Sequence, residues 1–146
     1  KAVAKACERD GIPGELIIYG HAPMMVSAQC VYKNYASCIK ERKNGSKSQP
    51  EHLYLNDRYQ KQFEVSRNCT HCYNVIYNSQ PTSLLHQARE IRGLVFGSYR
   101  IVFRNETEQE LQYILQQYTD AFVNGKEILP PKEGTFTNGH FRRGVD

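Results

Sequence analysis

Four of the five cysteines form two pairs whose spacing suits metal binding. Seven residues separate Cys30 from Cys38, and two residues separate Cys69 from Cys72. A C-x2-C pair lets one turn of backbone present two sulfurs to one metal, and a second pair from another loop completes a set of four thiolates. We therefore predict that Cys30, Cys38, Cys69 and Cys72 hold a metal centre.

The residues leave the identity of this metal open. Zinc and iron-sulfur clusters both accept four thiolates, and the spacing matches no standard ferredoxin run. A third hypothesis treats the cysteines as small buried hydrophobic residues, with or without an adventitious disulfide. His71 is left outside the ligand set, because a side chain between two ligands generally points elsewhere. Cys7 lies on the predicted opening helix and is assigned to the hydrophobic core.

No hydrolase pattern accompanies the cysteines. The chain has no H-E-x-x-H zinc helix, no G-x-S-x-G elbow and no phosphate loop. Catalytic residues therefore stay unassigned, and the chain alone is expected to do no chemistry.

The composition indicates a reduced, non-secreted protein. The sequence has 146 residues, of which 40% are hydrophobic, and its formal net charge is +4. No apolar run approaches the roughly 20 residues that cross a bilayer, and no signal segment precedes a cleavage site, so we expect no membrane and a cytoplasmic parent protein. A basic run near Lys40 and Lys47 has two interpretations, an anionic partner or a solvated loop.

Three short apolar runs predict buried strands, at residues 15–19, 73–77 and 99–103. Two alternating runs at 53–56 and 63–66 flank Asp57-Arg58 and predict a β-hairpin. The segment from His21 to Asn34 shows no period, and no element is predicted there.

Two helices are predicted between and after these strands. The first begins at Pro81, presents Leu84, Leu85, Ala88 and Ile91 on one face, and ends at Gly93. The second begins at a capping box formed by Thr107 and Glu110 and ends at Asn124-Gly125 in a left-handed cap. Its predicted apolar stripe is Leu111, Ile114, Leu115, Tyr118 and Phe122.

Strands that alternate with helices predict an α/β fold with parallel crossovers, although too few strands are present to close a barrel. Residues 39–67 are expected to be an inserted loop and hairpin. Because the sequence starts at Lys1 with a helix already under way, the chain is expected to be a cut piece of a longer protein. The remainder of that polypeptide is then its first partner, and exposed strand edges would favour artificial dimers.

Three stretches resemble the peptidase U32 (collagenase-like protease) family. They are YGHAPMMVSAQC at 19–30, NCTHCYNVIYNSQPTSLL at 68–85, and GTFTNGHFRRGV at 134–145, which resembles the T-x-G-H-x-x-R-G-V segment after that family's barrel. The stretches touch the beginning, centre and end of the chain. One departure is that Tyr35-Ala-Ser-Cys38 replaces the commoner S-G-R-C and precedes a long insertion.

The resemblance implies a partial TIM-like (β/α) barrel, with residues 1–146 as a single fragment and 126–146 as a post-barrel tail. It also implies a 4Fe-4S cluster held by Cys30, Cys38, Cys69 and Cys72. Family members include collagenase-like peptidases and proteins that support hydroxylation of RNA or ubiquinone. The expected function is therefore the metal-binding part of an enzyme that acts on RNA, with a peptidase acting on a peptide substrate, or a structural zinc module, as alternatives.

Overall fold

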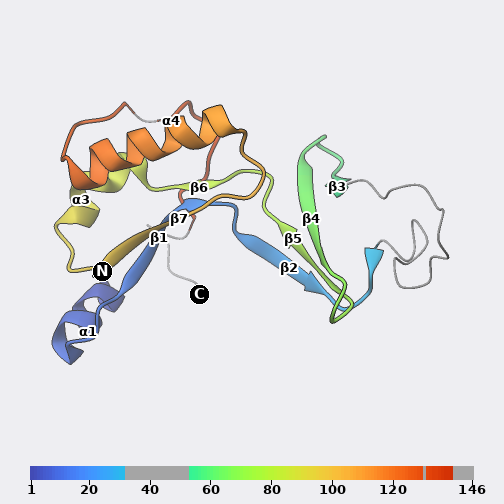
Figure 1. Cartoon of the computed structure of the whole chain (residues 1–146), viewed down its shortest axis with the longest axis horizontal. Coiled ribbons are helices and arrows are strands. Elements are labelled where there is room, and N and C mark those ends of the chain that lie inside the picture. The colour runs from blue at the N-terminus through green and yellow to red at the C-terminus, as the bar shows by residue number, and fades with distance from the viewer. Residues whose placement is uncertain (32–52, 130, 140–146) are drawn as a thin grey trace. The chain divides into compact units, whose positions relative to one another are not determined.

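The computed structural model describes residues 1–31, 53–129 and 131–139, and the chain divides into two compact units (Figure 1). The first unit comprises Lys1–His21 and Gln80–Asp146. The second comprises Ala22–Ser79 and contains the predicted insertion. Helices and strands are mixed, as the α/β prediction requires, and neither sheet is closed. Within the described ranges no helix is long and apolar enough to cross a membrane.

The first unit is built on a three-stranded sheet of order β6-β1-β7. Strand β1 is Glu15–Gly20, β6 is Thr82–Ser83 and β7 is Ser98–Val102. Strands β1 and β7 run parallel, so the predicted parallel crossover is confirmed for this pair. Strand β6 is antiparallel to β1.

Helices α1 (Ala2–Asp10), α3 (Ala88–Arg92) and α4 (Glu108–Tyr118) complete the first unit. The capping box at the start of α4 is confirmed, since Thr107 Oγ1 accepts from Glu110 N and Thr107 N donates to Glu110 Oε2. A π-helical turn over Thr119–Val123 follows, and Gly125 has the predicted left-handed backbone, with φ of 72°. The core of this unit is formed by side chains of α3, α4 and their flanking turns packed against the sheet. It contains Ile18, Tyr19, Leu84, Leu85, Ala88, Ile91, Tyr118, Ala121 and Phe122.

Two predictions for these helices were wrong in detail. Pro81 does not begin a helix, because Thr82–Ser83 first pairs with β1 and Ser83 N also donates to Thr137 O. A 3₁₀ turn over Leu85–Gln87 then leads into a short α3. On α4, Leu115 is 40% exposed and does not belong to the buried stripe.

The second unit is a four-stranded antiparallel sheet of order β2-β5-β4-β3. The strands are β2 (Pro23–Ser27), β3 (Leu53–Asn56), β4 (Gln62–Asn68) and β5 (Tyr73–Tyr77). The predicted hairpin is confirmed by the pairing of β3 with β4. Its turn is closed by Asp57 Oδ1, which accepts from Tyr59 N at 2.7 Å and from Lys61 N at 2.9 Å.

The prediction of parallel crossovers was wrong for strand β5. It pairs antiparallel with both β2 and β4, because only four residues connect β4 to β5 and parallel neighbours need a much longer connection. Strand β2 lies where no element was predicted. Its central residues Met24, Met25 and Val26 are all exposed, so the alternation that marks a half-buried strand is missing.

Candidate metal centre and a tyrosine-lined cavity

Cys69 and Cys72 lie in the tight turn between β4 and β5. The last ladder pair before this turn is Asn68 with Tyr73, so the C-x2-C sequence forms the entire loop. Asn68 Oδ1 accepts from His71 N at 3.0 Å. Cys72 takes a left-handed backbone conformation, with φ of 57°, which is uncommon for a residue with a side chain. The chain thus closes this loop with cysteines at both ends.

Both thiols of the turn are free and accessible. Cys69 is half-buried and Cys72 is exposed. The Cys72 thiol lies 3.9 Å from Cys69 O, a weak contact within the turn's own backbone. The ring of His71 stacks on that of Tyr73, with centroids 6.5 Å apart and planes 18° from parallel. The His71 ring therefore has an aromatic neighbour within the turn, and its place outside the ligand set stays a prediction.

Cys30 lies at the same end of this sheet as the C-x2-C turn. In the β2–β5 ladder Ser27 is opposite Asn74, so the chain leaving β2 passes the start of β5. Figure 1 shows the tip of the β2 arrow beside the β4–β5 turn. Asn74 Nδ2 donates to Gln29 O at 2.7 Å and ties the residue before Cys30 to the strand that follows Cys72.

Asn74 is the best-buried polar residue of this end of the sheet. It is 0% exposed, and its Oδ1 atom has no hydrogen-bond partner among the described residues. A buried amide oxygen without a partner usually indicates a missing water, ion or neighbouring group. The thiols of Cys30, Cys69 and Cys72 are soft ligands of the type that zinc and iron-sulfur clusters accept. The donor set therefore fits a thiolate-bound metal in type.

The placement of the predicted ligands is only partly described. Cys38, the fourth predicted ligand, lies outside the described residues. Within the described ranges, no three His, Cys, Asp or Glu side chains are grouped closely enough to hold a metal ion. The structure thus brings Cys69 and Cys72 into one turn and Cys30 to the same sheet end, without bringing the three sulfurs into one cluster.

Cys7 belongs to the first unit and is not part of its hydrophobic core. It is half-buried on α1, where a Cβ atom added to Gly14 would lie 2.9 Å from its Sγ. Cys7 therefore lies in a different unit from the other described cysteines, as its distance from them along the chain suggested. The assignment of Cys7 to the core was wrong.

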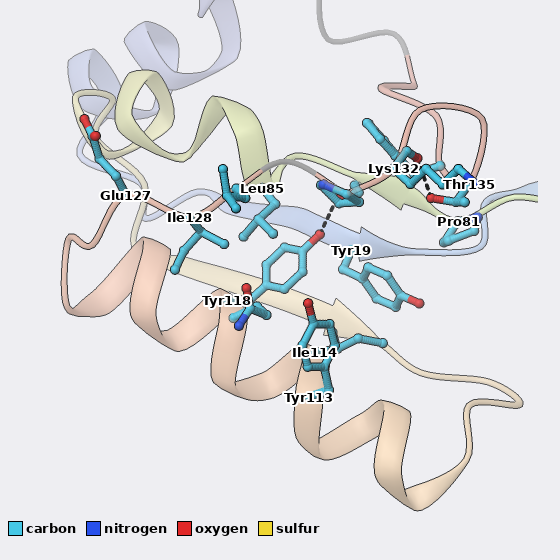
Figure 2. Close-up of a pocket in the computed structure, with 15 residues that line it drawn as sticks. Tyr19, Pro81, Leu85, Tyr113, Ile114, Tyr118, Glu127, Ile128, Lys132 and Thr135 are labelled. Carbon is cyan, nitrogen blue, oxygen red and sulfur yellow. Dashed lines mark hydrogen bonds between the residues drawn. The ribbon is translucent and has the colours of Figure 1, made fainter.

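The first unit also contains a cavity of about 530 Å³ between α4, the sheet and the segment after α4 (Figure 2). Its walls are largely apolar and aromatic, with Tyr19 from β1, Tyr113 and Tyr118 from α4, and Phe136 from the later segment. A volume of this size is typical of small-molecule sites. Sequence patterns did not indicate it, because its wall combines residues far apart in the chain.

Two tyrosine hydroxyls of this cavity are held by neighbours. Tyr118 Oη lies 2.6 Å from Ser83 Oγ, and burial raises the pKa of Tyr118 to about 12. Tyr19 Oη donates to Glu106 Oε1 at 3.0 Å. Burial, and then the negative charge of Glu106, raise the pKa of Tyr19 well above its ordinary value. Both phenols therefore stay protonated at neutral pH and present neutral hydroxyl groups.

Searches of family models, curated proteins and solved structures found no match to this chain.

Proposed function

We propose that this chain carries the metal centre of an enzyme of the peptidase U32 family. In this proposal Cys30, Cys38, Cys69 and Cys72 hold a 4Fe-4S cluster, and the whole cytoplasmic protein uses it to support hydroxylation of RNA. The family motifs quoted above support the assignment to that family. The observation that carries the metal proposal is the position of Cys30 and the C-x2-C turn at one end of one sheet.

The order of elements in the first unit is compatible with part of a (β/α) barrel. Strand β1 and strand β7 are parallel neighbours, α3 lies between them in sequence, and α4 follows β7. Apart from strand β6, which is antiparallel to β1, this is the β-α-β-α order from which such barrels are made. The antiparallel unit Ala22–Ser79 then follows the first of these strands in the sequence as an insertion, and it contains Cys30, Cys69 and Cys72.

The residues of the antiparallel unit have clear roles in such a site. The hydrogen bond from Asn74 Nδ2 to Gln29 O fixes the backbone before Cys30. The closed turn fixes Cys69 and Cys72 relative to each other. An iron-sulfur cluster, when bound, supplies one-electron transfer.

A structural zinc site is the second candidate, and the same turn supports it. A C-x2-C sequence that forms a complete hairpin turn is a common half of structural zinc sites. In that case the metal would only tie the insertion together. Metal content distinguishes the two candidates.

The test is metal analysis of the chain purified without oxygen, with matched cysteine variants. Cys69→Ser should lose most of the metal, whereas Cys7→Ser, which removes a thiol from the other unit, should keep it. A brown protein with iron and acid-labile sulfide supports the cluster. Stoichiometric zinc supports the structural module instead. Equal metal content in the two variants would remove the four-cysteine site from either account.

A further inference from the structure

A second cavity in the first unit has three cationic side chains among its ten lining residues. Its volume is about 400 Å³, and it lies between α3 and the segment after the π-helical turn. Arg89 and Arg92 come from α3, and Lys126 comes from the later segment. His86 lies at the same wall, and Glu127 is the acidic residue of the lining. Cationic side chains gathered in a cavity produce a positive electrostatic potential there, which attracts anions.

The two arginines have unused hydrogen-bonding capacity. They are three residues apart on α3 and therefore share one face. Neither side chain forms a hydrogen bond or ion pair with another residue in the described ranges. The neighbouring acids are engaged by other cations, since Glu90 pairs with Lys1 at 2.6 Å and Asp120 pairs with Lys126 at 2.9 Å.

Glycine at position 125 is required for the placement of Arg92. Gly125 has φ of 72°, and a Cβ atom added there would collide with Arg92 Nη1. The guanidinium group therefore lies directly against the Gly125 backbone. This contact holds one cation at the cavity wall and offers a way to displace it without changing its charge.

The acidic residue of the lining limits how strongly the cavity attracts anions. Glu127 lines both this cavity and the tyrosine-lined one. Figure 2 shows its carboxylate directed away from Tyr118 and Ile114. Since Lys126 is already paired with Asp120, the two arginines are the groups that would meet a ligand, and Glu127 would oppose them.

We propose that this cavity binds a phosphate group through Arg89 and Arg92. Guanidinium groups match phosphate geometry because they donate two parallel hydrogen bonds to its oxygens. The phosphate is either part of an RNA backbone or carried by a small phosphorylated ligand. The RNA source rests on the proposed function, whereas binding of a small ligand does not.

The experiment measures binding of two probes, inorganic phosphate by NMR titration and a short single-stranded RNA by fluorescence anisotropy at several salt concentrations. Arg92→Ala and Arg89→Ala should each weaken phosphate binding by about tenfold, the effect of losing one charge-assisted interaction. Gly125→Asn tolerates the left-handed backbone but displaces Arg92, so it should weaken binding with no change of charge. Glu127→Gln should tighten it.

Arg58→Ala is the matched control, because it removes the same charge from the turn of the other unit. If RNA supplies the phosphate, Arg92→Ala also lowers the salt dependence of RNA binding by about one unit of slope, whereas Arg58→Ala does not. If only inorganic phosphate responds, the site takes a small phosphorylated ligand.

The proposal is overturned if Arg58→Ala weakens phosphate binding as much as Arg92→Ala does, or if neither arginine variant changes it. Urea unfolding of each variant separates these results from loss of folding. The metal content of the Arg92→Ala protein should equal that of the unchanged chain. The proposal of a phosphate site and the proposal of a metal centre are therefore tested independently.

Discussion

At the scale of single residues, Asn74 connects the two parts of the predicted metal centre. Its Nδ2 atom donates to Gln29 O, its side chain is fully buried, and its Oδ1 atom has no partner among the described residues. The apolar run at 73–77 did not suggest this role, because the contact joins β5 to a segment for which no element was predicted. The orphaned oxygen is therefore a finding of the structure alone.

Replacing Asn74 with aspartate should destabilise the antiparallel sheet at neutral pH. The variant has nearly the same shape, but it turns the donor into a second acceptor that faces Gln29 O and buries a charge. A buried polar group left unpaired costs about 1–3 kcal/mol, and a charged one more. Urea unfolding measures the loss, with Asn56→Asp, an exposed position of the same sheet, as the control. Equal stability of the two variants would show that the Asn74 contact does not hold the sheet end.

Asp120 gives the clearest prediction for how the stability of the fold depends on pH. Its carboxylate accepts from Lys126 at 2.9 Å, Asn124 at 2.8 Å and Gln116 at 3.0 Å, and these partners lower its pKa from 3.8 to about 2. Because the folded pKa lies below the unfolded one, the stabilisation is complete above the unfolded value and is lost as the pH falls from about 4 toward 2.

Comparison with Asp120→Asn tests this directly. The original chain should be the more stable protein near pH 6, and the difference in unfolding free energy should shrink as the pH approaches 2. Thermal or urea unfolding at a series of pH values measures it. A difference that stays constant across this range would mean that the carboxylate's ion pair and hydrogen bonds do not support the end of α4.

At the scale of elements, local signals predicted local structure well. The β-branched run of β1, the turn residues of the β3–β4 hairpin and the capping box of α4 all act within a few residues, and each is confirmed. Strand β6 depends instead on Thr137, which is distant in sequence and pairs with Thr82. Pro81 followed by apolar residues therefore indicated a helix that the long-range pairing prevents.

Strand β2 is an edge strand of the described antiparallel sheet and carries exposed apolar side chains. In the described sheet it pairs with β5 alone, so its other edge carries unpaired backbone groups, and Met24, Met25 and Val26 are each more than half exposed. Such an edge is a template for pairing with a second copy. Val26→Lys should weaken concentration-dependent association in sedimentation velocity, because a charged side chain would have to be buried at the new pairing. Val123→Lys, at an exposed apolar position outside any strand, should leave association unchanged; equal effects of both would exclude the β2 edge.

At the scale of the whole chain, the α/β composition was predictable but the division into two sheets was not. Strand 73–77 has the composition of a core strand, and only the four-residue connection to β4 places it in an antiparallel sheet. The antiparallel arrangement, which was not predicted, nevertheless supports the predicted metal site. Antiparallel pairing of β2, β5 and β4 is what brings Cys30 to the same end as Cys69 and Cys72.

The central claim is that thiolates from the two loops bind one iron-sulfur cluster. Its most direct test is the amount of iron and acid-labile sulfide in the chain prepared and kept without oxygen. The account predicts about four of each per chain, as a 4Fe-4S cluster requires, and broad absorbance in the visible range. A colourless protein with one zinc ion per chain, or with no bound metal at all, would contradict it.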